Sequence, residues 1–223
     1  MKVKVCGMTS LEQLRQLEDL TVPFAGFIFY HKSPRYVFKH GLTGEDVKKA
    51  KLKLAKVGVF VNAGYEEIKK QVDIFGLDMV QLHGHETPYE CAKIANYIHV
   101  IKAFRFGEND HVEWTIKDYY QDTDMFLFDT GIQEKNDKDS TIYGGTGRKF
   151  NWERLKGLNI NKPYFLSGGI EPTDAGIIKT FMQEPVAKDL FVVDINSRFE
   201  KSPGIKDMGK VEQFIKALNS ENG

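Results

Sequence analysis

Eight short apolar runs, rich in Val, Ile and Phe, recur along the chain, and their spacing constrains the fold more than any other feature. They start about 20 to 40 residues apart, which is too far for hairpins, and most intervals carry apolar residues at the helical period. The runs cover residues 3–6, 26–30, 57–61, 79–82, 100–104, 125–129, 164–167 and 191–195. The pattern predicts eight β-strands, each followed by a helix.

The class of sheet follows from the polarity of these runs. Strands that are apolar on both faces are typical of a parallel sheet covered by helices. Eight βα units in 223 residues allow about 28 residues each, close to a compact (β/α)8 barrel. A doubly wound sheet is the alternative, but residues 6–10 (CGMTS) lack the G-x-G-x-x-G turn that normally follows its first strand. We therefore predict an α/β protein with one (β/α)8 TIM barrel domain over residues 1–223.

Charge and cysteine content exclude several classes of protein. Lys plus Arg and Asp plus Glu both total 31, so no general attraction to nucleic acid or to an anionic membrane is expected. No apolar run approaches the roughly 18 residues that a membrane span needs. Two cysteines, Cys6 and Cys91, and a charged start in place of a signal peptide fit a reducing cytosol. We expect a cytoplasmic protein with no nucleic-acid or membrane partner.

Polar residues gather where the predicted strands end, which is the face on which barrel active sites are built. Cys6 closes the first strand; a strand cysteine is by default a small core residue, but a thiolate at this position could act as a base if its pKa were lowered. Asp129 ends the apolar run MFLF, and apolar neighbours favour a protonated carboxyl that can donate a proton. The two residues are candidates for a base and an acid that face each other across a bound sugar.

Two glycine clusters indicate an anion site. They follow the sixth and seventh predicted strands, at residues 144–147 (GGTG) and 167–169 (SGG). Residues without Cβ let backbone N–H groups approach an anion closely, and the loops after strands seven and eight are the usual phosphate site of this fold. Glycine pairs are also ordinary turn residues, and neither cluster has the order of a nucleotide P-loop. A phosphate ester is the expected ligand.

His83, His85 and Cys91 raise the question of a metal site. Only the two histidines lie close together in the sequence, and Cys91 falls in a predicted helix, so no metal is expected. His83 either bonds within the core or lines the pocket. Arg35 is either a surface arginine or a guanidinium fork suited to a substrate carboxylate.

Together, these strand ends resemble those of phosphoribosylanthranilate isomerases of tryptophan biosynthesis. The resemblance runs in order from residue 3 to about residue 207 and covers nearly the whole chain. The matching strings are VKVCGMT (3–9), GFIFY (26–30) with SPRY (33–36), VGVFVN (57–62), VQLHG (80–84), FDT (128–130), YGGTG (143–147), LSGGI (166–170) and PGIKD (203–207). One string alone would be weak evidence, but eight in register are specific.

The resemblance implies an Amadori rearrangement of N-(5-phosphoribosyl)anthranilate, a small-molecule substrate, to the deoxyribulose phosphate isomer without any cofactor. By similarity, Cys6 is the general base that removes the C2 proton of the sugar. Asp129 is by similarity the general acid that protonates the ring oxygen. Arg35 matches the family arginine at the anthranilate carboxylate, and Asp194 matches an aspartate at the mouth of the barrel.

The same resemblance assigns further substrate contacts. His83 is a candidate substrate-binding residue. The implied phosphate contacts are Gly145, Gly147, Gly168, Gly169, Asn196 and Ser197. Where the family often has Ser-Ser-Gly after the strand-eight aspartate, this chain has Asn196-Ser197-Arg198, so Arg198 either contacts phosphate or points into solvent. The polar insertion at 133–141 is a second departure.

Two alternatives remain open at this point. A related phosphate-binding barrel enzyme is one, although neither the Lys/Glu pairs of indole-glycerol phosphate synthases nor the Asp pairs and metal-binding histidines of ribulose phosphate epimerases are visible. A noncatalytic sugar-phosphate-binding barrel is the other. The sequence leaves both a monomer and a homodimer possible.

Overall fold

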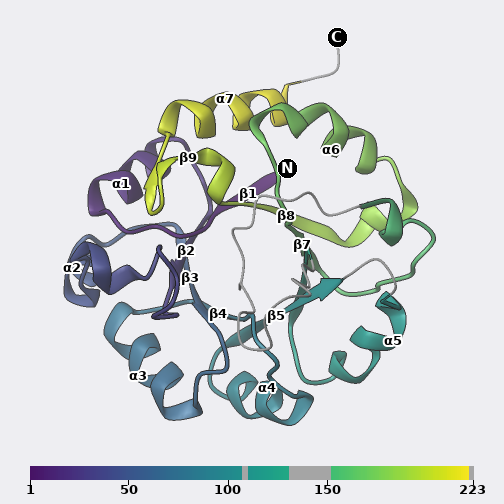
Figure 1. Cartoon of the computed structure of the whole chain (residues 1–223), viewed down its shortest axis with the longest axis horizontal. Helices are drawn as coiled ribbons and strands as arrows, with labels where there is room; N and C mark the ends of the chain where they lie inside the picture. Colours follow the sequence, from purple (N-terminus) through teal and green to yellow (C-terminus); the bar gives the residue numbers. More distant parts are fainter. Residues whose placement is uncertain (107–109, 131–151, 221–223) are drawn as a thin grey trace, which may run out of the picture.

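The computed structural model describes residues 1–106, 110–130 and 152–220, and it confirms the predicted barrel. Eight parallel strands, hydrogen-bonded in chain order, form a closed ring at the centre of the molecule (Figure 1). The strands are β1 Lys2–Val5, β2 Phe24–Ile28, β3 Ala55–Phe60, β4 Met79–Leu82, β5 His99–Phe106, β6 Met125–Thr130, β7 Tyr164–Leu166 and β8 Leu190–Ile195. The ring closes between β1 and β8, where Lys4 pairs with Asp194.

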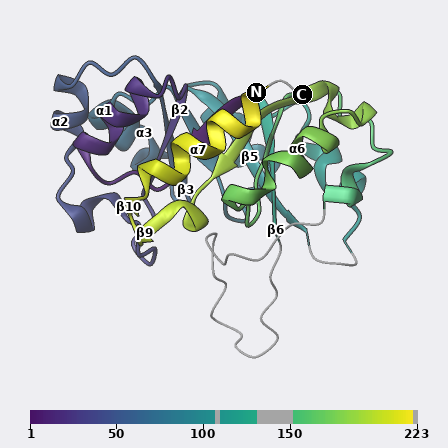
Figure 2. The same cartoon turned by 90° about the horizontal axis from the view of Figure 1, so that it is seen from above.

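Helices surround this ring (Figures 1 and 2). The α-helices are α1 Leu11–Asp19, α2 Gly44–Lys49, α3 Tyr65–Phe75, α4 Pro88–Ala95, α5 Val112–Ile116, α6 Ala175–Phe181 and α7 Met208–Asn219. Short 3-10 turns are η1 Val37–His40, η2 Lys117–Tyr119, η3 Trp152–Leu155, η4 Pro172–Asp174, η5 Pro185–Asp189 and η6 Ser197–Phe199. In the described residues between β6 and β7, η3 stands where we expected an α-helix. It ends near Gly157, whose positive φ of 80° is typical of a residue that terminates a helix.

A small antiparallel hairpin between β8 and α7 was not predicted. It consists of β9 Glu200–Ser202 and β10 Ile205–Lys206. Its turn contains Gly204 at a φ of +86°, and a Cβ there would lie 2.9 Å from His40 Nε2. Thr9 donates a hydrogen bond to the Gly204 carbonyl. The hairpin is therefore packed against the loops that follow β1 and β2.

Two apolar cores flank the strands. One lies between strands and helices, and the other fills the interior of the ring with Phe24, Val57, Ile101, Ala103, Leu127, Phe165 and Val192. Successive residues of a strand point to opposite faces, so these interior residues identify which positions of each strand face inward. Both faces of the strands are covered, which explains why the runs are apolar without alternation.

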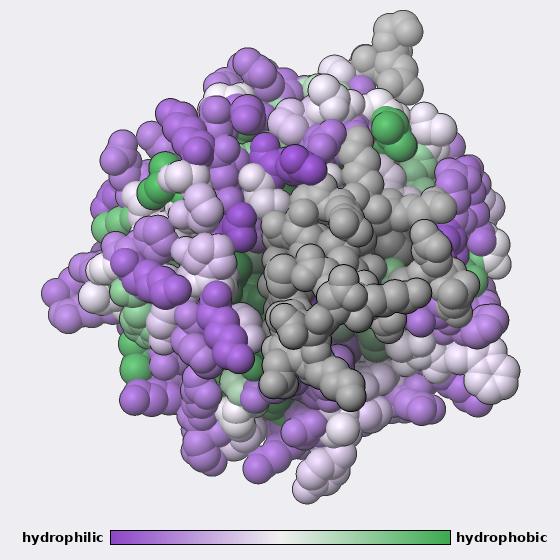
Figure 3. All heavy atoms as spheres, in the orientation of Figure 1, coloured by the Kyte–Doolittle hydropathy of each residue, from purple (hydrophilic) through white to green (hydrophobic). Residues whose placement is uncertain are grey.

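The outer surface is mostly polar. On the side shown in Figure 3, hydrophilic residues predominate and hydrophobic ones are scattered. The large exposed apolar residues, such as Tyr89 on α4, Trp114 on α5 and Ile177 on α6, come from different helices. Of the helices in the described segments, none has the length and apolar character that crossing a membrane would require.

Candidate active site

The inward-facing positions change from apolar to polar toward the carboxyl ends of the strands. Asp194 lies two positions after the interior residue Val192, closer to the carboxyl end of β8. Lys4 on β1 pairs with it where β1 and β8 meet. Cys6 lies two residues after Lys4, and Asp129 lies two residues after the interior residue Leu127, so both point inward as well. The candidate base and acid are therefore both placed at the end of the ring where the fold builds its sites.

A buried chain of polar contacts crosses this end of the barrel. Lys4 Nζ donates to Asp194 Oδ2 and to Gln81 Oε1, each at 2.9 Å. Gln81 Nε2 lies 2.7 Å from His83 Nδ1, and His83 Nε2 lies 3.2 Å from Asp129 Oδ2, although without hydrogen-bond alignment. Lys4 also interacts with the thiol of Cys6. One network thus joins the sulfur of Cys6 to the carboxylate of Asp129, and His83 lines the site.

This network fixes the tautomer of His83. The amide oxygen of Gln81 accepts from Lys4, so its NH2 group is the part that faces His83 Nδ1. Nδ1 must then accept a hydrogen bond, and in the neutral ring the proton sits on Nε2. Nε2 lies near Asp129 but is not aligned for a hydrogen bond with it, and no hydrogen-bond partner for Nε2 lies among the described residues.

The ionisation of Cys6 differs from the lowered pKa that the sequence hypothesis needs. The side chain is 5% exposed, and burial raises the pKa of the thiol. The positive charges of Lys4 and, to a smaller extent, Lys206 lower the thiol pKa, and the negative charge of Asp194 raises it. Burial also raises the pKa of Asp194, because the stabilising charge of Lys4 does not fully compensate for the loss of water. Taken together, burial and these charges raise the pKa of the Cys6 thiol.

Arg35 is not a surface arginine. Its side chain is buried, and its guanidinium binds Glu200 through Nε to Oε1 at 2.9 Å and Nη2 to Oε2 at 2.7 Å. Lys206 Nζ also donates to Glu200 Oε1 at 2.8 Å. Burial works against the charge of Glu200, but the hydrogen bonds from Arg35 and the Lys206 cation outweigh it and hold the Glu200 pKa below its usual value. The β9–β10 hairpin thus holds the guanidinium group of Arg35 in one orientation.

The side chain of Arg35 and the loop after β1 approach each other closely. Gly7 has a φ of +74°, and a Cβ at this position would lie 2.8 Å from Arg35 Cδ and 2.9 Å from Asn196 Oδ1. Asn196 Oδ1 in turn accepts from Lys206 Nζ at 2.7 Å. Only a residue without a side chain fits between these groups, so Gly7 lets β1, β2 and β8 converge on one site.

The structure describes some, but not all, of the candidate phosphate-binding residues. Gly168 and Gly169 have φ angles of 97° and 66°, a conformation that favours glycine, and they follow β7 as predicted. Ser197 begins η6 directly after Asn196. Gly145 and Gly147, like the insertion at 133–141, lie outside the described residues.

Arg198 is partly exposed to solvent and also contacts a carboxylate. Its side chain is 46% exposed, but Nε lies 3.4 Å from Glu171 Oε1. The arginine therefore forms an ion pair with the segment that precedes η4, beside the loop that contains the two glycines after β7.

Sequence reasoning missed several buried polar residues. Lys4 and Gln81 lie two positions before Cys6 and His83, so the strand period of two could have placed them on the same inner face. Glu200 and Lys206 had no such signal, because the hairpin that carries them was not predicted. Each of the four is tied to a candidate site residue by a hydrogen bond or an ion pair.

Metal ligation finds no support in the part of the chain that the structure describes. No cluster of three or more His, Cys, Asp or Glu side chains there could hold a metal ion. His85 is exposed, whereas Cys91 is fully buried in α4 and burial raises the pKa of its thiol to about 12. These two side chains do not share a site with His83.

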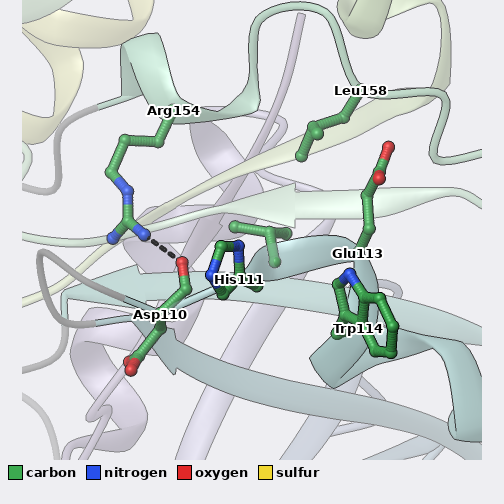
Figure 4. A pocket seen from close by; sticks show the side chains of 7 residues that line it. Asp110, His111, Glu113, Trp114, Arg154 and Leu158 are labelled. Carbon is green, nitrogen blue, oxygen red and sulfur yellow. Dashed lines mark hydrogen bonds between the residues drawn. The ribbon is translucent and has the colours of Figure 1, made fainter.

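A separate shallow pocket of about 230 Å³ lies beside α5 (Figure 4). It is lined by His111, Trp114, Leu158 and neighbouring residues, and Arg154 donates a hydrogen bond to the Asp110 carbonyl at its edge. None of the candidate catalytic or binding residues lines it, so it is distinct from the barrel mouth.

Comparison with known proteins agrees with the family that the sequence resembles. Residues 3–217 match the family described as N-(5'phosphoribosyl)anthranilate (PRA) isomerase. The isomerase of Parabacteroides distasonis is 36% identical over 219 residues, which cover 98% of this chain and 93% of that protein. The crystal structure of the isomerase from Thermotoga maritima has a TM-score of 0.78 at 32% identity and covers 98% of both chains.

A second solved structure carries a ligand. It is a phosphoribosylanthranilate isomerase in complex with reduced 1-(o-carboxyphenylamino)-1-deoxyribulose 5-phosphate, 29% identical, with a TM-score of 0.72 and 98% coverage of both chains. Sequence match, identity over the full length and barrel geometry all agree. The chain belongs to the N-(5'-phosphoribosyl)anthranilate isomerase family, the aldose-ketose isomerases of tryptophan biosynthesis.

Proposed function

We propose that Cys6 and Asp129 are the general base and general acid of the isomerisation of N-(5'-phosphoribosyl)anthranilate by this chain. The observation that carries the proposal is the buried polar chain from Cys6 through Lys4, Gln81 and His83 to Asp129, which places both groups around one end of the barrel. A sugar held at this end has the thiol on the β1 side and the carboxyl on the β6 side.

The proposed reaction needs one proton donor and one proton acceptor. Asp129 gives a proton to the ring oxygen, and the C1–O bond breaks as the nitrogen lone pair forms an iminium ion. The sulfur of Cys6 then takes the C2 proton, and the C–H electron pair forms the enamine that tautomerises to the ketone. No external reductant or oxidant enters, because oxidation at C2 balances reduction at C1.

Two regions of the site are suited to the two anionic ends of the substrate. Arg35, fixed by Glu200, is suited to the anthranilate carboxylate, since a planar guanidinium binds such a group through parallel hydrogen bonds. Gly168, Gly169, Asn196 and Ser197 lie after β7 and β8, where this fold binds phosphate. The bound analogue of the related isomerase has both a carboxyphenyl group and a 5-phosphate.

The proposal is tested by adding the purified chain to phosphoribosylanthranilate and following the loss of substrate fluorescence. We expect turnover that falls by about 10²- to 10⁴-fold in the Cys6→Ala and Asp129→Asn variants. Tight binding of the reduced product analogue without any turnover would instead support a noncatalytic sugar-phosphate-binding barrel. We also propose that the protein is cytoplasmic. It is either a monomer or a homodimer, and light scattering measures which.

Replacement of Arg35 by Lys is expected to raise the KM for phosphoribosylanthranilate by about 10-fold or more, since a charged hydrogen bond contributes about 1.5 to 3 kcal/mol. An ammonium group retains the charge but cannot present two parallel N–H groups. Arg15, exposed on α1, provides the matched control, and Arg15→Lys should leave the KM unchanged. An unchanged KM in Arg35→Lys would contradict a carboxylate contact at this residue.

A further inference from the structure

Lys4 is the most deeply buried cation of the barrel mouth, and the isomerase motif gives it no role in the reaction. Its side chain has no exposed surface, yet it carries an ammonium group in the interior of the ring. Burial alone would lower its pKa, but the charges of Asp194 and Cys6 and hydrogen bonds to them outweigh burial and raise it. The group therefore stays protonated, and a buried charge of this kind requires partners that hold it.

The partners of Lys4 bring it to the sulfur of Cys6. Asp194 Oδ2 and Gln81 Oε1 each accept a hydrogen bond from Nζ at 2.9 Å. Gly26 on β2 leaves room beside them: a Cβ at this position would lie 2.8 Å from Cys6 Sγ and 3.1 Å from Lys4 Cε. The sulfur and the end of the lysine side chain thus share the space that a side chain on β2 would otherwise fill.

We propose that Lys4 is a positioning residue that favours the thiolate form of Cys6 by holding a buried ammonium group beside the sulfur. This inference rests on the proposed role of Cys6 as the general base. A base of this kind has to lose its proton before each turnover, and an adjacent cation stabilises the anion that results.

The other charged groups around the sulfur do not replace Lys4. Asp194 on β8 disfavours the thiolate, whereas Lys206 on β10 favours it less strongly than Lys4 does. Lys206 is also engaged by Glu200 and Asn196, and burial lowers its pKa to about 8, so it is partly neutral in mildly alkaline solution. Gly26 on β2 contributes no charge. The balance between Lys4 and Asp194 therefore sets how readily Cys6 ionises.

The direct test is a titration of the thiol in the free protein. The ultraviolet absorbance of the thiolate is followed against pH in the unmodified chain and in Lys4→Met, with Cys6→Ser as the blank. The Cys91 thiol, whose pKa burial raises to about 12, is removed by Cys91→Ala in every protein of the series, so that only Cys6 contributes to the thiolate signal. We expect the apparent pKa of Cys6 to rise by about 1 unit or more in Lys4→Met, as for loss of an opposite charge at close range. Lys2→Met, an exposed lysine on the same strand, should leave it unchanged.

The kinetic test separates ionisation from structure. At neutral pH, kcat/KM of Lys4→Met should fall about 10-fold or more, one factor of ten for each unit of pKa. It should then recover as the pH rises toward the new pKa, because hydroxide restores the thiolate. A reduction by the same factor at every pH would show that Lys4 has only a structural role, and would overturn the proposal.

A second variant keeps the proposal testable if Lys4→Met does not fold. Asp194→Asn removes the anion that disfavours the thiolate, while the Gln81 oxygen and the Cys6 sulfur still hold the Lys4 ammonium group, so the pKa of Cys6 should fall. An unchanged or raised pKa in this variant would overturn the proposal. The titration tests the Lys4 proposal without depending on turnover. Full activity of Cys6→Ser would refute only the assignment of Cys6 as the base. Failure of the Lys4 proposal and failure of the proposed function can therefore be told apart.

Discussion

Replacement of Cys6 by Ser is expected to lower kcat by about 10²- to 10⁴-fold, the usual contribution of a positioned acid or base. A hydroxyl group fits where the thiol was, but its pKa is far higher, so it does not accept the C2 proton near neutral pH. KM should change much less, since the variant keeps the residues proposed to bind the carboxylate and the phosphate. Steady-state kinetics with phosphoribosylanthranilate, followed by fluorescence, measures both constants.

Two further variants complete this experiment. Asp129→Asn should lower kcat by a similar factor, because an amide cannot give a proton to the ring oxygen. Cys91→Ala removes the second cysteine, which is buried in α4 away from the barrel mouth, and should retain the parent kcat. If both Cys6→Ser and Asp129→Asn kept the parent kcat, the acid–base assignment would be wrong.

Replacement of Glu86 by Ala should lower the free energy of unfolding by about 3 to 5 kcal/mol, the cost of removing one partner of a buried ion pair. Glu86 Oε2 binds Lys102 Nζ at 2.7 Å, and both side chains are 3% exposed. Glu86 also accepts hydrogen bonds from the backbone N–H groups of Asn62 and Gly84. The variant would leave an ammonium group in the interior without its carboxylate.

Urea unfolding followed by circular dichroism measures this loss. Glu67→Ala, at an exposed position of α3, is the matched control and should change stability by no more than about 0.5 kcal/mol. Equal stability of the two variants would contradict a structural role of the Glu86 ion pair. Because Glu86 binds the Gly84 N–H directly after His83, we also expect a lower kcat in Glu86→Ala.

The sequence predicted the barrel because strand pattern and spacing are local properties. Runs apolar on both faces, separated by helical segments, leave few folds besides a closed parallel ring. The strand ends also indicated Cys6, Asp129 and Arg35 as candidates, the resemblance assigned a role to each, and the structure places all three at the carboxyl end of the ring.

What the sequence could not supply was the set of partners from distant strands. The hydrogen bond between Gln81 and Lys4 joins residues 77 positions apart, and the contact of Arg35 with Glu200 spans 165. Such pairs depend on strand register and on a hairpin with only two or three residues in each strand. The raised pKa of Cys6 also depends on burial, which is a property of the closed ring and not of the motif.

The pairing of Arg35 with the β9–β10 hairpin has a consequence for synthesis of the chain. A ribosome delivers Arg35 long before Glu200, which is 165 residues later, and Lys4 long before Asp194, which is 190 residues later. A nascent chain that stops before β8 has neither the seam that closes the ring nor the acid that orients the guanidinium. The guanidinium of Arg35 gains its carboxylate partner, and the barrel its closing pair of strands, only when the last unit has left the ribosome.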